Sequence, residues 1–251
     1  MQLENKKIIV TGGTRGIGAA TVKLYVKEGA QVVFCGTNDV RGKETEEKVN
    51  SLGFPGHATY INCNIASKEA VDEFFAKAVE ILGGLDVLAN VAGVEANMAA
   101  TDYTKENTEF LMDVNVYGTV YTNQAAYKIF KENGVEGSII NYASDVALTG
   151  MPNGAMYAAS KAAVNALTRS WAKELGKFGV RVVGIAPGIL EATGLRTISY
   201  ETALAYTRGI TVEQLRAGYS KTGTTPMGRS GKLSEVASTV AFMASEQSSY
   251  I

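Results

Sequence analysis

A tyrosine and a lysine four residues apart are the residues of this sequence best suited to acid–base chemistry. Tyr157 and Lys161 fall one turn apart on one face of a helix. A free phenol has a pKa of about 10, and a neighbouring ammonium group favours the phenolate and lowers that pKa. Ser144 follows an apolar run at 137–143, typical of a buried strand, and its hydroxyl is placed to bond the oxygen that the phenol protonates. The set predicts proton transfer at a carbonyl oxygen, although the spacing of Tyr157 and Lys161 also occurs on ordinary solvated helices.

A glycine-rich turn lies near the start of the chain. Gly12, Gly16 and Gly18 come directly after the apolar run 6–10 and precede a helix expected at 19–28. Glycines let the backbone approach a pyrophosphate, and a helix N-terminus supplies N–H donors and a favourable dipole. This strand–turn–helix context predicts a dinucleotide-binding site.

The end of the second strand bears on which dinucleotide is bound. An acidic residue there would bond the ribose hydroxyls of NAD, but the tip at Thr37 carries no carboxylate. Arg15 in the turn and Arg41 nearby are placed to meet a 2′-phosphate. We therefore expect NADP(H) to be preferred. The alternative, NAD(H), requires that Arg15 contact the pyrophosphate or the protein surface and that Asp39 reach the ribose.

Strand and helix patterns alternate along most of the chain. This alternation predicts one domain with a parallel sheet covered by helices on both faces, a doubly wound α/β or Rossmann fold. The long fourth helix is expected to break near Gly118. The strands are expected at 6–10, 30–35, 58–63, 85–90, 137–143 and 180–185, and the helices at 19–28, 40–52, 67–82, 104–131, from Tyr157 to about 178, and 233–244.

The strand pattern stops after Pro187. The segment at about 190–225 is polar from 194 onward, with short helices expected at 200–207 and 211–219. Ligands bind beyond the carboxyl ends of the strands in this fold, so the segment is expected to form a lid over the site; a helical surface decoration is the alternative. Its cations either bind a substrate phosphate or pair with nearby glutamates. They are Arg196, Arg208, Arg216 and Lys221.

Composition excludes several classes of function. A formal net charge of −1 over 251 residues does not indicate binding to nucleic acid or to an acidic membrane surface. No apolar run reaches ~18 residues, so no membrane span is expected. Cys35 and Cys63 lack metal-ligand spacing and predict reduced core thiols of a cytoplasmic protein, with no metal site. His57, the one histidine, lies in a turn-rich connection and is expected at the surface.

The motifs together resemble those of the short-chain dehydrogenase/reductase family over nearly the whole chain. The segment 90–93, Asn-Val-Ala-Gly, is similar to the family's Asn-Asn-Ala-Gly, Asn115 to its helix asparagine, and Pro187-Gly188 to the turn beside the nicotinamide. The resemblance implies an NAD(P)-dependent oxidoreductase that interconverts a ketone and a secondary alcohol.

The resemblance also implies roles for single residues. Tyr157 would be the general acid or base, Lys161 would lower its pKa and hold the nicotinamide ribose, and Ser144 would orient the substrate oxygen. Asn115 would hold a water in a proton relay. The implied cofactor-binding residues are Gly12, Thr14, Arg15, Gly16, Ile17, Gly18, Thr37, Asn64, Ile65, Asn90, Ala92, Gly93, Tyr157, Lys161, Pro187, Gly188, Ile189 and Thr193.

The sequence departs from the family pattern at four places. Asn64 stands where the family usually has an aspartate facing the adenine, and Val91 replaces the second asparagine of Asn-Asn-Ala-Gly. The threonine after Pro187-Gly188 is displaced to Thr193. Family members also continue beyond the position of Ile251 into a last strand, so the resemblance implies a further C-terminal tail.

The substrate is indicated only through members of the family. Residues 181–236 are most similar to sorbitol-6-phosphate 2-dehydrogenases, whereas the N-terminal half resembles 3-oxoacyl-carrier-protein reductases and bacterial hydroxysteroid dehydrogenases. The expected partner is accordingly a small ketone or alcohol, with a sugar phosphate as first expectation. The resemblance further implies a homodimer or homotetramer, built on the helices that carry Asn115 and Tyr157. A nucleotide-sensing protein without catalysis is the distant alternative.

Overall fold

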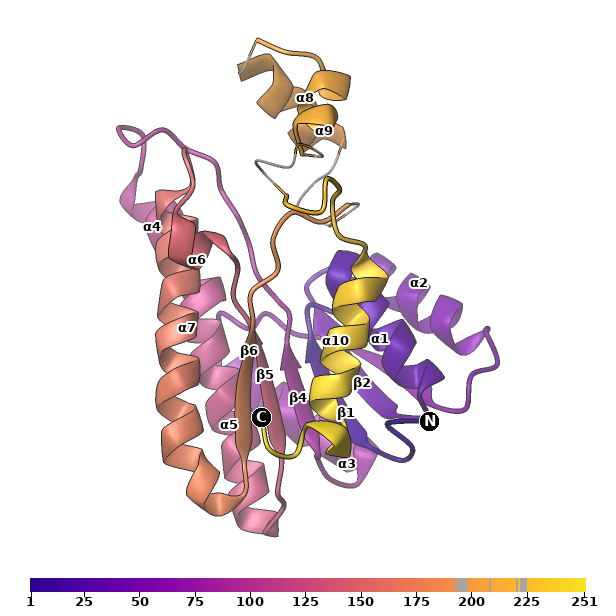
Figure 1. Cartoon of the computed structure of the whole chain (residues 1–251). Coiled ribbons are helices and arrows are strands. Elements are labelled where there is room, and N and C mark those ends of the chain that lie inside the picture. The colour runs from indigo at the N-terminus through magenta and orange to yellow at the C-terminus, as the bar shows by residue number, and fades with distance from the viewer. Residues whose placement is uncertain (192, 194–197, 208, 220, 222–224) are drawn as a thin grey trace.

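A six-stranded parallel sheet forms the centre of the computed structural model, which describes residues 1–191, 193, 198–207, 209–219, 221 and 225–251 (Figure 1). The strand order is β3-β2-β1-β4-β5-β6, so the order reverses between β1 and β4, where such sheets open a ligand crevice. The fold class expected from the sequence is confirmed. The strands are β1 (Lys7–Thr11), β2 (Gln31–Gly36), β3 (His57–Asn62), β4 (Val87–Asn90), β5 (Ser138–Tyr142) and β6 (Arg181–Ile185).

Helices connect the strands and cover the sheet on both faces. Several begin at residues whose side chains bond the first free backbone N–H groups, as Ser67 does for α3 by accepting from Ala70 N at 3.1 Å. The α-helices are α1 (Gly16–Lys27), α2 (Asp39–Asn50), α3 (Lys68–Leu82), α4 (Lys105–Met112), α5 (Gly118–Asn133), α6 (Val146–Thr149), α7 (Ala155–Leu175), α8 (Ile198–Thr207), α9 (Val212–Tyr219) and α10 (Leu233–Ala244). The other helical turns are η1 (Asp113–Tyr117), η2 (Gly176–Phe178) and η3 (Glu246–Ser248).

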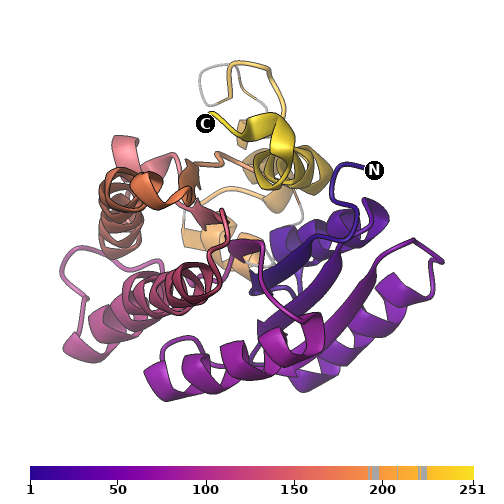
Figure 2. The ribbon, with the colours of Figure 1, turned by 90° about the horizontal axis from the view of Figure 1, so that it is seen from below.

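Alternating strand residues build two cores, one on each face of the sheet. Ile8 and Val10 of β1 pack in the cluster that contains residues of α1 and α10, whereas Ile9 packs in the cluster with residues of α3, α5 and α7. Figure 2 shows α10 on one side of the sheet and α3 and α5 on the other. Burial on both faces explains why the central strands are largely apolar, whereas the edge strand β3 carries exposed polar residues at both ends.

The long fourth helix is interrupted, as expected, but by a π-helical turn. The turn η1 lies directly before Gly118, and such turns are frequent at functional sites. A Cβ at Gly118 would lie 2.7 Å from Ile65 Cδ1, so the glycine lets α5 approach the loop after β3 closely. The first helix begins at Gly16 rather than at 19, because the glycine turn itself supplies its first residues.

The segment after β6 contains the two expected short helices, α8 and α9, which Figure 1 shows beyond the carboxyl ends of the strands. Of the cations expected there, Arg196 and Arg208 lie outside the described residues. Within the described part of the chain, no helix is long and apolar enough to cross a membrane. His57 is exposed, and Cys35 and Cys63 are buried free thiols, as expected.

Candidate active site

A cavity of about 1340 Å³ lies over the carboxyl ends of the strands and joins both ends of the predicted site. The glycine turn forms one part of its wall, and Tyr157 and Lys161 form another. Asn90 and Asn115 are the two predicted site residues that do not line it. Those that do are Gly12, Thr14, Arg15, Gly16, Ile17, Gly18, Thr37, Asn64, Ile65, Ala92, Gly93, Ser144, Tyr157, Lys161, Pro187, Gly188, Ile189 and Thr193.

The glycine turn has the shape that a dinucleotide pyrophosphate needs. Gly12 has φ +69°, and a Cβ there would lie 2.6 Å from Ala92 Cα. A Cβ at Gly18 would lie 2.0 Å from the Gly12 carbonyl oxygen, so any side chain would fill the turn. The N-cap of α1, Arg15, makes no side-chain cap hydrogen bond, which leaves N–H groups of the first turn for a phosphate. These residues fit a bound dinucleotide.

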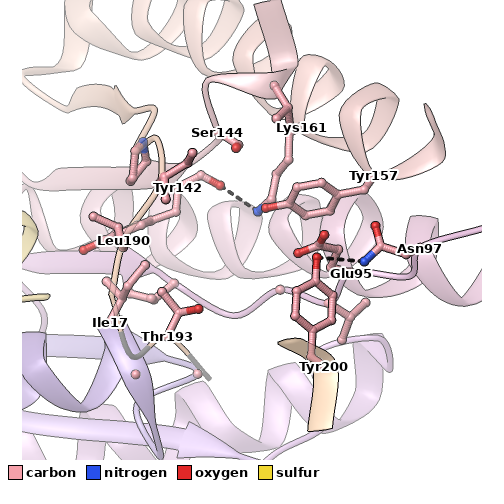
Figure 3. Close-up of a pocket in the computed structure, with 18 of the residues that line it drawn as sticks. Ile17, Glu95, Asn97, Tyr142, Ser144, Tyr157, Lys161, Leu190, Thr193 and Tyr200 are labelled. Carbon is pink, nitrogen blue, oxygen red and sulfur yellow. Dashed lines mark hydrogen bonds between the residues drawn. The ribbon is translucent and has the colours of Figure 1, made fainter. Parts of the chain in front are cut away.

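The acid–base residues converge on the cavity from β5 and α7. Ser144, Tyr157 and Lys161 are all largely buried. Lys161 Nζ lies 5.8 Å from the centroid of the Tyr157 ring and donates to the Tyr142 carbonyl oxygen at 2.9 Å. Figure 3 shows the Lys161 amine and the Tyr157 phenol close together on the cavity wall.

The expectation that Lys161 lowers the pKa of Tyr157 is not met in the protein without cofactor. The pKa of Tyr157 is raised to about 12, mainly by burial and in smaller part by the charge of Glu95, while a hydrogen bond with Ser144 acts in the opposite direction. Burial also lowers the pKa of Lys161 to about 8. Desolvation disfavours the charged form of either group, and it is the largest cause of both shifts.

Asn115 is buried beside the cavity, and its side chain bonds two separate segments of the chain. Its Oδ1 accepts from Val94 N at 2.8 Å, and its Nδ2 donates to Val94 O at 2.8 Å and to Ser160 Oγ at 3.0 Å. The side chain thus joins the loop after β4 to the residue before Lys161. A Cβ at Gly93 would lie 3.2 Å from Lys161 Nζ and 3.3 Å from Asn115 Oδ1, so both of these atoms lie close to Gly93.

Asn90 belongs to a buried polar network rather than to the cavity wall. Its Nδ2 donates to Asn141 Oδ1 at 3.0 Å, and its Oδ1 accepts from Thr122 at 2.8 Å. Asn141 continues the network by donating to Thr168 at 3.1 Å. Buried amides need such partners, so this network ties β4 and β5 to α5 and α7.

Three residues that the sequence did not single out also line the cavity. Glu95 and Asn97 come from the loop after β4, and Tyr200 comes from α8. Asn97 Nδ2 donates to Tyr200 Oη at 2.8 Å, and Figure 3 shows Glu95 between Tyr200 and Tyr157. The sequence signal available for Glu95 was a carboxylate two residues after Gly93. Its link to Tyr200, more than one hundred residues away, was not visible in the sequence.

No group of side chains suited to hold a metal ion occurs in the described part of the chain. The described site combines a glycine-rich turn at a helix N-terminus with a phenol, an amine and a hydroxyl around one cavity. Such a combination on a doubly wound sheet defines a dinucleotide-dependent oxidoreductase.

The family model for short chain dehydrogenases matches residues 6–204. The chain belongs to this family and is an NAD(P)-dependent oxidoreductase that acts on CH–OH groups.

Curated relatives match along the whole chain. A sorbitol-6-phosphate 2-dehydrogenase from Klebsiella pneumoniae is 40% identical, with 100% of this chain and 93% of the relative covered. A 3alpha-hydroxysteroid dehydrogenase from Mediterraneibacter gnavus is 35% identical, with 100% and 94% covered. Among solved structures, an NAD+-bound xylitol dehydrogenase superposes with a TM-score of 0.90 at 27% identity, covering 100% of this chain and 96% of the other.

Proposed function

We propose that this protein interconverts a ketone and a secondary alcohol with Tyr157 as the proton donor in reduction and the acceptor in oxidation. The observation that carries the proposal is the convergence of Ser144, Tyr157 and Lys161 on the wall of the glycine-lined cavity. Bound NAD(P) supplies or accepts the hydride, and its oxidised ring adds a positive charge that favours the phenolate.

Each side chain has a distinct task in this proposal. The Ser144 hydroxyl bonds the substrate oxygen and holds it against the Tyr157 phenol, so that the proton moves over a short distance. Lys161 holds the cofactor ribose. Asn115 holds a water of the proton relay, and its contacts with Val94 and Ser160 keep the cavity wall in place.

NADP(H) is the proposed cofactor of choice. Arg15 and Thr37 line the cavity at the tip of β2, where a 2′-phosphate would meet the guanidinium. Asp39, the carboxylate that an NAD ribose would need, accepts from Asn62 Nδ2 at 2.7 Å and from Tyr60 Oη at 3.0 Å. Both bonds go to Oδ1; they lower the pKa of Asp39 and hold its carboxylate toward β3. The NAD+ bound to the related xylitol dehydrogenase keeps NAD(H) as the alternative.

A sugar phosphate is the first proposed substrate class, by similarity to the sorbitol-6-phosphate 2-dehydrogenase. Lys221 lines the cavity and is the described lid cation that suits a phosphate. Arg216 is engaged elsewhere, since it bonds Glu201 at 2.6 Å, which is the glutamate pairing considered from the sequence.

A steroid or acyl chain is the second candidate substrate class. Apolar side chains at Val94, Phe110 and Met151 line part of the same cavity, and the hydroxysteroid dehydrogenase is a relative of similar coverage.

The test is a substrate screen with NADPH and NADH against ketoses, ketose phosphates, oxosteroids and 3-oxoacyl thioesters. Loss of reduced-cofactor absorbance with at least one class is expected. Tyr157→Phe is expected to lower kcat by about 100-fold or more, since general acid–base groups contribute factors of this size, and to retain the melting-temperature increase caused by cofactor. Tyr250→Phe, at a fully exposed position outside the cavity, is the control. Undiminished turnover in Tyr157→Phe would remove Tyr157 from its proposed role.

We also propose that the protein assembles as a homodimer or homotetramer through the faces of α5 and α7. Tyr117 is 49% exposed and stacks on Tyr121 with 6.4 Å between ring centroids, and Phe110 is exposed nearby in sequence. Apolar surface of this kind is frequent at subunit contacts. Gel filtration with light scattering tests the assembly, and a monomer at working concentration would contradict it.

A further inference from the structure

Glu95, Asn97 and Tyr200 form a polar cluster on the cavity wall next to Tyr157. Two segments far apart in the sequence supply it: the loop after β4 and the lid helix α8. Figure 3 shows the Glu95 carboxylate directed between the two tyrosine rings. The mechanism proposed above uses none of these three side chains, so their place beside the proton donor calls for a separate role.

The hydrogen bonds of the cluster run in one direction. Asn97 Nδ2 donates to Tyr200 Oη at 2.8 Å. The Tyr200 hydroxyl has a single proton, and its hydrogen bond to Glu95 lowers the pKa of that carboxyl. The chain of donors therefore ends at Glu95, which is an acceptor. A carboxylate has about four lone-pair sites, and the bond from Tyr200 uses one of them.

The Glu95 carboxylate is in large part removed from water. Burial raises its pKa, which is the larger of the two effects on this group. A buried acceptor is stable when a donor reaches it. The charge of Glu95 also raises the pKa of Tyr157, so the carboxylate lies close to the phenol. A ligand group that donates to Glu95 is consequently held beside the atom that Tyr157 protonates.

We propose that Glu95, with Asn97 and Tyr200, binds a substrate hydroxyl group on a carbon next to the reacting one. This inference rests on the proposed function and specifies its substrate class: hydroxyketones and polyols, rather than ketones with hydrocarbon on both sides. Substrate O–H donates to Glu95. Tyr200 orients the carboxylate from the lid side, and Asn97 fixes the direction of the Tyr200 hydroxyl.

The same cluster disfavours the other substrate classes at this position. A steroid ring or acyl chain beside Glu95 would cover the carboxylate without offering a donor, which reduces kcat/KM by about 10- to 100-fold for one unpaired acceptor. A phosphate beside Glu95 would place like charges together. A sugar phosphate therefore fits with its hydroxyl chain at Glu95 and its phosphate elsewhere in the cavity.

The experiment compares kcat/KM for 1-hydroxy-2-butanone and 2-butanone, which differ by one hydroxyl next to the carbonyl. Because their intrinsic reactivities are the same in every variant, only the change in the ratio between variants is interpreted. Glu95→Leu is expected to lower the ratio by about tenfold or more, mainly by raising KM for the hydroxyketone. Glu95→Gln retains an acceptor oxygen and is expected to restore part of the ratio.

Two further variants separate this role from general damage to the lid. Tyr200→Phe removes the hydroxyl that orients Glu95 and is expected to lower the same ratio by a smaller factor. Glu201→Gln makes a conservative change on the same helix, at the carboxylate that bonds Arg216, and is expected to leave the ratio unchanged. The melting-temperature increase caused by cofactor verifies that each variant is folded.

An unchanged ratio in Glu95→Leu overturns the inference and leaves the proposed function in place. Turnover of other ketones without turnover of 1-hydroxy-2-butanone overturns it as well. Absence of turnover by the wild type with every ketone and alcohol of the screen refutes the proposed function, and this inference with it.

Discussion

Replacing Lys161 with methionine is expected to stabilise the folded protein at pH 7 while removing its activity. Lys161 as a residue is 5% exposed, and it lies on the wall of the cavity. Burial lowers its pKa from the ordinary 10.5 to about 8. At pH 7 the folded protein therefore holds a buried charge, and methionine has a similar length without that charge.

The size of the effect follows from the pKa. One pKa unit corresponds to about 1.4 kcal/mol, so burying the Lys161 ammonium costs the folded state about 3 kcal/mol below pH 8. The substitution also leaves the Tyr142 carbonyl without its donor, at a cost of about 1–2 kcal/mol. The net gain is about 1–2 kcal/mol, or a melting temperature higher by about 3–6 °C for a chain of this size.

The gain depends on pH with a defined sign. The folded-state pKa lies below the unfolded-state pKa, so the unfolded chain binds more protons between pH 8 and 10.5, and wild-type stability from this group rises with pH in that window. The advantage of Lys161→Met is expected in full below pH 8 and is lost by about pH 10.5. Thermal unfolding of both proteins without cofactor at pH 7 and pH 10, followed by circular dichroism, measures it.

Lys128→Met is the matched control, because Lys128 also lies on a helix but its side chain is 75% exposed. A small change in melting temperature that does not vary between pH 7 and 10 is expected for it. If Lys161→Met has the wild-type melting temperature or a lower one at pH 7, or a difference that is constant with pH, the assignment of a strained buried ammonium is refuted.

Two further predictions concern the cofactor end of the cavity. Gly18→Ala would place its Cβ 2.0 Å from the Gly12 carbonyl oxygen. We expect it to lower the free energy of unfolding by about 1–3 kcal/mol and to raise the cofactor Kd, measured by calorimetry, by at least tenfold. The control is Gly176→Ala, which has open space around its Cβ and is expected to change neither quantity. Arg15→Ala is expected to raise KM for NADPH by about 10- to 100-fold, the worth of one hydrogen bond to a charged phosphate, and KM for NADH by less than about threefold; an equal effect on both would contradict the proposed NADP(H) preference.

The parts of the fold that the sequence predicted correctly depend on local pattern. The alternation of strands and helices, the helix at 67–82 and the helix at 233–244 were all predicted from neighbouring residues. The break near Gly118 was also expected, but its π-helical form depends on how closely α5 approaches Ile65. A sequence pattern shows where a glycine interrupts a helix, and the packing partner shows why.

The candidate site, like the fold, has features that local sequence pattern predicts and features that depend on packing. The spacing of Tyr157 and Lys161 and the context of the glycine turn were sufficient to predict that these groups lie in one site. Helix periodicity and strand–turn–helix geometry are both local. The pKa of Tyr157 was predicted with the wrong direction for the protein without cofactor. Spacing shows that a cation is near, whereas burial and the charge of Glu95, which spacing does not show, raise the pKa of Tyr157.

The sequence by itself determined which chemical groups are available: a glycine-rich turn, a phenol, an amine and a hydroxyl in the order of a doubly wound sheet. Only the tertiary structure decided how much water each group loses and which distant residue it meets. Asn90 bonds Asn141 outside the cavity wall, and Glu95 meets Tyr200 of α8. Desolvation and long-range contacts depend on the packing of the whole chain, so no local pattern contains them.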